Sequence, residues 1–294
     1  MEPLLILTLV LTVLVGVSLG LLGGGGSILM VPLLTYVAGL EPQQAITASL
    51  VVVGVTSAVS VVTHARHDRV QWRTGLVFGA AGMVGAFLGG LAGGHLPGQL
   101  LMIAFAVMML ATAGAMIRGR RKSAPQSAPT RLPVDKVLVE GLVVGLVTGI
   151  VGAGGGFLVV PALVLLGGLP MAVAVGTSLL VIALKSLAGV AGYLTTTVVD
   201  WPLVGALAVM AVAGSLVGAR LQARVPEEAL RRVFGWFVVG MGVLVLALEL
   251  PGPAAVALAV AVGVAAAAVA VCRLVPAGPC PVRPRGDAAT WMYP

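Results

Sequence analysis

Charged side chains are scarce in this chain of 294 residues, in which Asp, Glu, Lys and Arg together make up only 9%. Hydrophobic residues make up 59%, and several apolar runs reach or approach the roughly 20 residues that cross a bilayer. These runs contain no paired carboxylates, no Ser-His-Asp arrangement and no cluster of metal ligands. We therefore expect an all-α polytopic membrane protein, embedded in the lipid bilayer, with no catalytic residues, metal or cofactor.

Cysteine is rarer still, with 2 residues, and the basic residues gather in short loops. Cys272 and Cys280 stand near or beyond the end of the last apolar run without zinc-type or redox spacing, so they imply no disulfide framework. The net charge is +7 with a pI near 10.3, but Lys and Arg lie between apolar runs, as the positive-inside rule describes. The charge therefore indicates orientation in a membrane and not binding to nucleic acid. No basic region precedes the first apolar run, so we interpret residues 1–20 as a retained helix and not a cleaved signal.

The chain carries one unit twice, at an offset of 129 residues. Leu22–Pro32 (LGGGGSILMVP) aligns without a gap with Val151–Pro161 (VGAGGGFLVVP). The same offset pairs scarcer residues further on: Ser49 with Ser178, Ser57 with Ser186, Trp72 with Trp201, and Pro97 with Pro226. We expect two homologous multi-helix repeats at 1–117 and 137–250, a basic linker at 118–136, and an extra transmembrane helix and tail at 251–294.

Each repeat is predicted to consist of a pair of apolar segments separated by glycines, followed by three longer segments. In the first repeat the pair is 3–22 with 27–40, and the longer segments are 44–63, 74–93 and 99–117. In the second repeat the pair is 137–151 with 157–169, and the longer segments are 172–194, 203–222 and 230–249. A final segment at 253–272 has no counterpart.

Charge in equivalent loops predicts that the two repeats have opposite orientations. Loop 64–73 is basic, whereas its partner 193–202 contains no Lys or Arg. Conversely, loop 94–100 contains none, whereas its partner region holds Arg220, Arg224, Arg231 and Arg232. If basic loops face the cytoplasm, the repeats are inverted, which requires an odd number of crossings in each. Five crossings satisfy this, with the linker cytoplasmic; if the segments 27–40 and 157–169 re-enter instead, four crossings and parallel repeats result.

The two glycine clusters interrupt apolar segments at equivalent positions. Hydrocarbon does not tolerate unpaired backbone, so an interrupted helix must be buried in protein or line a polar cavity. Broken spans in repeat-related positions point to the substrate site of a transporter. A helix restarting at Ser27 or Phe157 would present free N–H groups and its positive dipole end, which suits an anion. Alternatively the glycines only permit close packing, as the four-residue spacing of Gly85, Gly89 and Gly93 indicates elsewhere.

Polar side chains also follow each break inside apolar helices, in ITASLVVVGVTS (46–57) and VGTSLLVIALKS (175–186). Thr177 and Ser178 precede Lys185 by about two turns, so they share a helix face with it. Each hydroxyl could instead bond to a carbonyl of its own helix. A mid-helix lysine costs about 3 kcal/mol or more unless it faces a cavity or a partner. Lys185 could therefore contact an anion, snorkel to an interface or form a structural ion pair.

These stretches, together with the RVQWR and VVDWP turns, resemble the sulfite exporter TauE/SafE family over about residues 5–250. The resemblance implies a secondary transporter that moves small sulfur-containing anions, such as sulfite or organosulfonates, usually outward across the bacterial cytoplasmic (inner) membrane. The implied substrate site comprises both breaks and the hydroxyl-bearing segments, with Lys185 as the anion contact: Gly25, Gly26, Ser27, Thr47, Ser49, Ser57, Gly154, Gly155, Gly156, Thr177, Ser178, Lys185 and Ser186. Thr56 stands where the second repeat has Lys185, so recognition of charge would be asymmetric.

The main hypothesis is alternating access, in which one repeat moves against the other around a small anionic substrate. Two alternatives stay open: an anion channel, and a non-transporting membrane scaffold or assembly protein in which the glycines serve packing alone. The glycines at four-residue spacing could equally serve packing within one chain or a homodimer.

Overall fold

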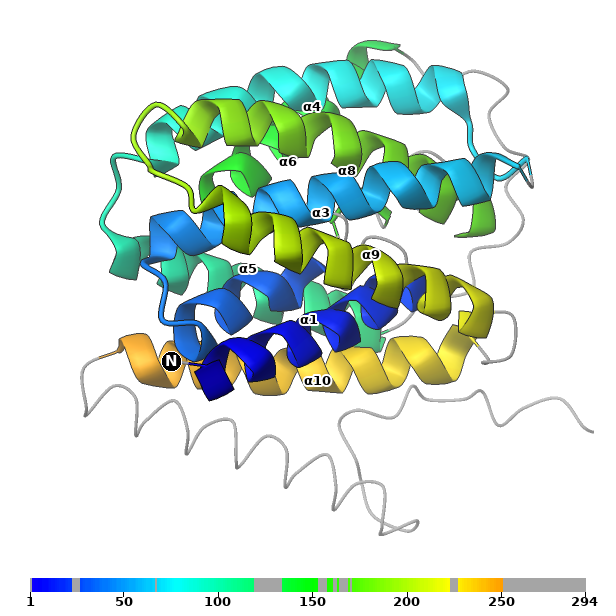
Figure 1. The fold of residues 1–294 in the computed structure, drawn as a ribbon. Coiled ribbons are helices and arrows are strands. Elements are labelled where there is room, and N and C mark those ends of the chain that lie inside the picture. The colour runs from blue at the N-terminus through cyan, green and yellow to red at the C-terminus, as the bar shows by residue number, and fades with distance from the viewer. Residues whose placement is uncertain are drawn as a thin grey trace, which may run out of the picture. The chain divides into compact units, whose positions relative to one another are not determined.

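All regular secondary structure in the described part of the chain is helical, and no strand occurs there. The computed structural model describes residues 2–22, 27–66, 68–118, 134–152, 158–160, 163, 169, 171–222 and 227–250. Figure 1 shows the helices, which are α1 (Glu2–Leu22), α2 (Met30–Pro32), the π-helical η2 (Leu33–Val37), α3 (Pro42–Ala65), α4 (Trp72–Gly93), α5 (Gly98–Arg118), α6 (Val134–Val151), α8 (Met171–Tyr193), α9 (Trp201–Gln222) and α10 (Glu227–Glu249). The expectation of an all-α membrane protein is confirmed.

Five of these helices, α1, α3, α4, α8 and α9, are long and apolar enough to cross a membrane. Shorter apolar helices lie at Ser27–Val37, Gly98–Gly114, Val137–Val151 and Val238–Glu249. These helices begin and end close to the apolar segments expected from the sequence. The expected extra helix at 253–272, most of the linker and the glycines at 23–26 and 154–156 lie outside the described residues.

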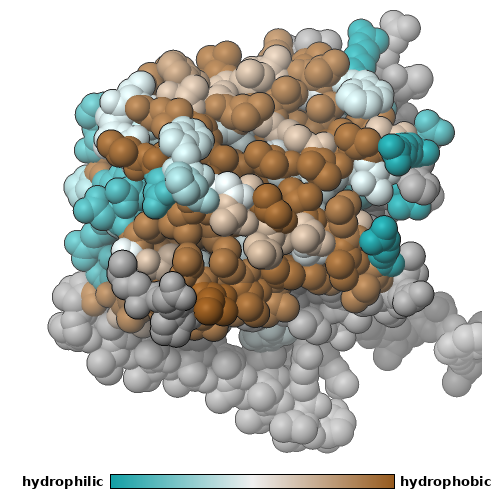
Figure 2. Space-filling model, viewed as in Figure 1, coloured by the Kyte–Doolittle hydropathy of each residue, from teal (hydrophilic) through white to brown (hydrophobic). Residues whose placement is uncertain are grey.

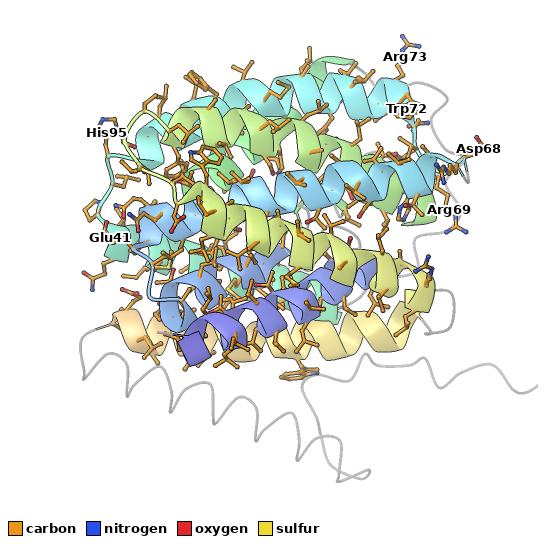
Figure 3. All side chains as sticks on the ribbon, viewed as in Figure 1. Glu41, Asp68, Arg69, Trp72, Arg73 and His95 are labelled. Atoms are coloured by element: carbon orange, nitrogen blue, oxygen red, sulfur yellow. The ribbon has the colours of Figure 1, made fainter. Side chains whose placement is uncertain are left out.

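The surface is apolar over its middle and polar at two opposite ends. Figure 2 shows a wide band of hydrophobic side chains with hydrophilic residues on either side of it. In Figure 3, Glu41 and His95 lie at one end, and Arg69 and Arg73 lie at the other. We name these the His95 end and the Arg69 end. An apolar belt between two polar ends is the surface of a protein that spans a bilayer.

Local sequence explains where several helices begin and end. Pro42 is among the first residues of α3, where its missing N–H leaves no hydrogen bond unmade. Asp200 precedes α9, and its Oδ1 accepts a hydrogen bond from the Leu203 N–H at 3.2 Å, which caps the helix. Gly152 ends α6 with a left-handed φ of 70°, and its N–H donates to the Thr148 carbonyl at 2.9 Å.

The segment after the first glycine cluster is short and buried, and it consists of three types of helix in succession. Ser27–Leu29 form a 3₁₀ turn, α2 follows with 3 residues, and η2 adds 5 residues of π-helix. Ser27–Val37 rises about 16 Å, which is roughly half of a 30 Å hydrocarbon core. Ile28, Met30 and Leu34 are at most 1% exposed, so protein encloses this backbone. The expected helix restart at Ser27 is therefore present as this half-length segment, whereas Phe157 lies outside the described residues.

Glycines join the first half of the sequence to the second in two helix pairs. A Cβ on Gly85 of α4 would collide with the Leu142 carbonyl of α6, and a Cβ on Gly214 of α9 would collide with the Val13 carbonyl of α1. Gly214 follows Gly85, and Leu142 follows Val13, by the same 129 residues. Helix α4 therefore packs on α6 as α9 packs on α1, with equivalent residues in contact.

Helices α3 and α8, which the 129-residue offset aligns, cross in opposite directions. Leu50 of α3 lies against Gly189 of α8, Gly54 against Ser186, and His64 against Gly176. Residue numbers therefore rise along α3 as they fall along α8. These contacts also join the two halves of the sequence. Residues up to Leu246 accordingly form one compact unit, and a second unit begins at Ala247.

Loops at equivalent positions of the two halves lie at opposite ends of this unit. Gln43 Nε2 donates to the Leu96 carbonyl at 3.0 Å, and Thr196 lies against Gly94, so the segments 40–43, 94–97 and 194–200 share the His95 end. Loop 66–71, the counterpart of loop 195–200, forms the Arg69 end (Figure 3).

We expect single cysteines at the equivalent loop positions 69 and 198 to be labelled from opposite sides of the membrane. Both Arg69 and Val198 are exposed, and the positive-inside rule places the Arg69 end in the cytoplasm. The variants Arg69→Cys and Val198→Cys, made on a Cys272→Ser, Cys280→Ser background, are treated with a membrane-impermeant maleimide in intact cells. Only Val198→Cys should react before the membrane is permeabilised.

His95→Cys serves as the control, because it shares the end of Val198 and should react in intact cells as well. Labelling of positions 69 and 198 from the same side would contradict the arrangement of the loops described above.

Candidate functional site

Lys185 is a charged side chain in the middle of α8, and it is buried. Its side chain is only 2% exposed, and its Nζ donates to Thr148 Oγ1 of α6 at 3.0 Å. Gly82 of α4 lies beside its Cβ, close enough that a Cβ there would be 3.9 Å away. The ammonium therefore points into the protein between α4 and α6, and it does not snorkel to an interface.

Thr148 is a neutral hydrogen-bond acceptor for the lysine and not a counter-ion. Its hydroxyl donates to the Val144 carbonyl at 2.7 Å, so its oxygen is left to accept from Lys185. No carboxylate of the described residues forms an ion pair with Lys185, and Glu140 on the same helix is eight residues before Thr148, about 12 Å along the axis. The structural ion pair considered from the sequence is therefore absent from the described part of the chain.

The lysine lies at the second helix break. Thr148 is in the last turn of α6, which ends at Gly152 directly before the glycines of the break. Tyr193 of α8 donates its hydroxyl to the Ile150 carbonyl, and Gly152 lies against Ile46 of α3. The end of α6 is thus held between α3 and α8. Gly154, Gly155 and Gly156 lie outside the described residues.

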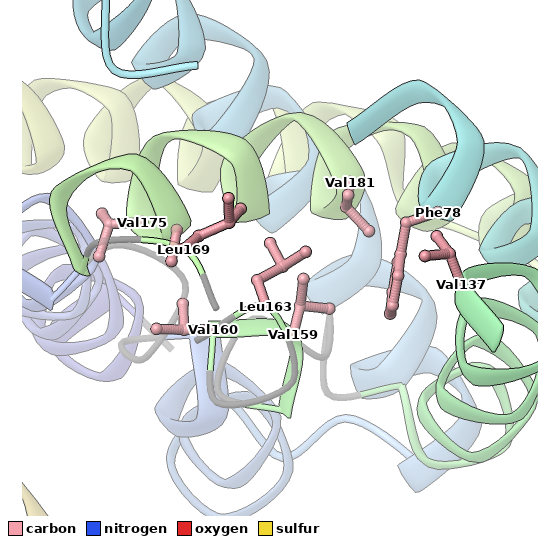
Figure 4. Close-up of a cluster of buried hydrophobic side chains, with 9 residues drawn as sticks. Phe78, Val137, Val159, Val160, Leu163, Leu169, Val175 and Val181 are labelled. Carbon is pink, nitrogen blue, oxygen red and sulfur yellow. The ribbon is translucent and has the colours of Figure 1, made fainter. Parts of the chain in front are cut away.

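The segment that follows this break packs on the face of α8 that carries Lys185. Figure 4 shows Val159, Val160 and Leu163 against a cluster that includes Val181 of α8 and Phe78 of α4. Lys185 is one turn beyond Val181, so the two side chains share this face. Protein therefore covers the described part of the second broken segment, as it covers the first.

In the described part of the chain, three buried serine hydroxyls have no hydrogen-bond partner. They are Ser49, Ser57 and Ser186, of which the last two occupy equivalent positions in the two halves of the sequence. Ser57 and Ser186 lie near the crossing of α3 and α8, where a Cβ on Gly54 would be 3.2 Å from Ser186 Cβ. A buried hydroxyl without a partner costs about 1–3 kcal/mol, so such groups call for a physical explanation.

The other hydroxyls predicted for the site have partners within the protein. Thr47 donates to the Gln43 carbonyl and Ser178 to the Val175 carbonyl, both at 2.7 Å, which is local bonding within their own helices. Thr177 Oγ1 accepts the Gln71 N–H at 2.9 Å and so holds the loop at the Arg69 end. Thr177 therefore holds that loop, and it lies eight residues before Lys185 on the side of α8 that faces α4. Ser27 is buried at the start of the first short segment, and Gly25 and Gly26 lie outside the described residues.

Thr148 is not among the residues predicted for the site, although the sequence carries a signal for it. Thr148 is the one hydroxyl residue in the apolar stretch 137–151, and it stands directly before the second break. Its equivalent in the first half is Leu19, and the equivalent of Lys185 is Thr56, which donates to its own Val52 carbonyl at 2.7 Å. The first half therefore has no counterpart of the lysine and threonine pair.

We expect Thr148→Val to destabilise the protein by about 1–3 kcal/mol, because it leaves a buried ammonium without its hydrogen-bond acceptor. Thermal unfolding of the detergent-solubilised variant measures this. Thr148→Ser, which keeps the oxygen, should unfold close to the wild type. Ser186→Ala removes a hydroxyl that makes no hydrogen bond and should cost nothing or raise the unfolding temperature. Equal losses in all three variants would contradict the assigned contacts.

Comparison with known proteins places the chain among membrane transporters. The family model described as sulfite exporter TauE/SafE matches residues 8–245. A "Probable membrane transporter protein" of Xylella fastidiosa (strain 9a5c) is 36% identical over 235 residues, covering 78% of this chain and 90% of the relative. "Probable membrane transporter protein YunE" of Bacillus subtilis (strain 168) is 27% identical over 248 residues, covering 76% and 91%. A similarly named protein of Methanocaldococcus jannaschii is 25% identical over 257 residues, covering 81% and 95%. No solved structure matches the chain.

Proposed function

The chain belongs to the sulfite exporter TauE/SafE family of membrane transporters, and from that premise we propose that it moves small sulfur-containing anions, such as sulfite or organosulfonates. The proposed direction is outward across the bacterial cytoplasmic membrane. Transport is secondary, by alternating access around a site at the second helix break.

The observation that carries this proposal is the buried ammonium of Lys185, for which the described residues provide no counter-charge. A charge held in a low-dielectric interior with one neutral partner is costly, and intramembrane ionisable residues are functional candidates for that reason. An anionic substrate would supply the missing charge. Lysine has three N–H donors and a flexible stem, so it can keep Thr148 as one partner and bind an oxyanion with the others.

The unpartnered serine hydroxyls support the same proposal. Ser57 and Ser186 are donors that make no hydrogen bond within the protein, and they lie where the two halves meet. Oxygen atoms of a sulfite or sulfonate group would accept from them. Lys185 points toward α6 and Ser186 toward α3, and the end of α6 contacts α3 at Ile46, so the proposed anion lies among α3, α6 and α8.

We further propose that the two halves are inverted repeats, and that the groups that move against each other are bundles that each contain helices of both halves. The antiparallel crossing of α3 and α8 supports inversion, since these helices occupy equivalent sequence positions. The tight pairs α4 with α6 and α1 with α9 each bring two helices close through glycine, which suits rigid elements. Relative motion would then open the site alternately to the two ends.

Uptake of radiolabelled sulfite into proteoliposomes tests the proposal directly. We expect saturable flux with the wild type and a loss of at least tenfold with Lys185→Gln. The glutamine removes the charge while keeping an N–H donor for Thr148, so the variant should still fold.

Arg73→Gln is the matched control, because it removes an exposed charge at the start of α4, far from the break. It should transport like the wild type. If Lys185→Gln transports normally, the lysine is not the anion contact. If folded wild-type protein shows no flux of any sulfur anion, the transport assignment fails and the scaffold alternative gains support.

A further inference from the structure

Resting on the proposed transport function, we infer that the transported species carries a single negative charge. The site would then select hydrogen sulfite and singly charged sulfonates, such as methanesulfonate, against sulfate, the sulfite dianion and sulfonates that carry a second negative charge. The discrimination depends on charge and not on the shape of the oxyanion.

The interior offers one positive charge to a substrate. Among the buried side chains of the described residues, Lys185 is the one lysine or arginine. The described arginines with placed side chains, which are Arg66, Arg69, Arg73 and Arg220, are all exposed. His64 is buried, but it is close to the Arg69 end, where its ring bonds to the Ser60 carbonyl. One ammonium compensates one negative charge.

The backbone at the break adds no positive charge on the side of α6. This helix ends at Gly152, so it presents its carbonyls and the negative end of its dipole to the break. The Tyr193 hydroxyl already donates to one of these carbonyls, at Ile150. A second negative charge on the substrate would be repelled by the carbonyls that remain.

The other polar groups of the site are neutral. Ser57, Ser186 and Thr148 offer hydroxyls, which satisfy substrate oxygens as donors or acceptors but do not balance charge. The equivalent positions in the first half, Thr56 and Leu19, bring no second cation. An uncompensated second charge would remain in an apolar interior, which is strongly unfavourable.

Competition against labelled sulfite flux separates the two charge classes. Methanesulfonate is a monoanion and sulfate a dianion throughout pH 6 to 9, whereas sulfite changes from largely monoanion to dianion across this range. We expect methanesulfonate to inhibit at least ten times more strongly than sulfate at every pH. We also expect the apparent affinity for sulfite to fall as pH rises, following the fraction of hydrogen sulfite.

Methanesulfonate also controls for titration of the protein, because its own charge does not change. The described residues that face Lys185 from α4 and α6, Gly82 and Thr148, carry no titratable group, so Lys185 itself is the group at the site whose titration this control must absorb. The pH profile of methanesulfonate inhibition is therefore subtracted from that of sulfite.

Sulfate that competes as well as methanesulfonate, or a sulfite affinity that does not follow the monoanion, would overturn the inference while leaving transport intact. Absence of any saturable flux would instead be a failure of the proposed function, so the two outcomes are distinguishable.

Discussion

An ammonium group in the interior of a membrane protein must lose its proton, pair with a negative charge or bind a substrate. Lys185 is such a group, buried in the middle of α8. The surrounding helices supply one neutral acceptor, Thr148, and no carboxylate from the described residues. Helices α3, α6 and α8 meet around the break that follows Thr148, with Tyr193 and Ile46 holding the end of α6. The described residues around Lys185 therefore offer it one neutral hydrogen-bond partner and no counter-charge.

The second constraint is that interrupted backbone cannot face lipid. The described parts of both broken segments are accordingly covered, the first by near-complete burial of Ile28 to Leu34 and the second by the cluster around Leu163. Close packing of glycine against backbone carbonyls joins α4 to α6 and α1 to α9. Each of these pairs unites the two halves of the sequence, so the halves are interlocked within one unit and are not two separate domains.

Much of this architecture could be predicted from hydropathy and from the 129-residue offset, because lipid exposure forces long apolar helices and because duplicated residues mark equivalent positions. The packing role of Gly85 followed from its spacing. Other features depend on contacts between distant segments. Thr148 became part of the site only when α6 was placed beside α8. Thr177 lies on the side of α8 that faces α4, as Lys185 does, but its hydroxyl accepts the Gln71 N–H of a loop that periodicity cannot place. Local patterns also could not tell which serines would lack partners, since Ser178 bonds to its own helix and Ser186 does not.

The central claim is that an anion binds the folded protein through the charge of Lys185. Thermal unfolding of purified protein in detergent, with increasing methanesulfonate, tests it without requiring transport, because a ligand that binds only the folded state raises the unfolding temperature. The account requires a concentration-dependent rise for the wild type and little or none for Lys185→Gln, with sodium chloride at equal ionic strength as the reference. An equal rise in both proteins, or no rise in either, would contradict it.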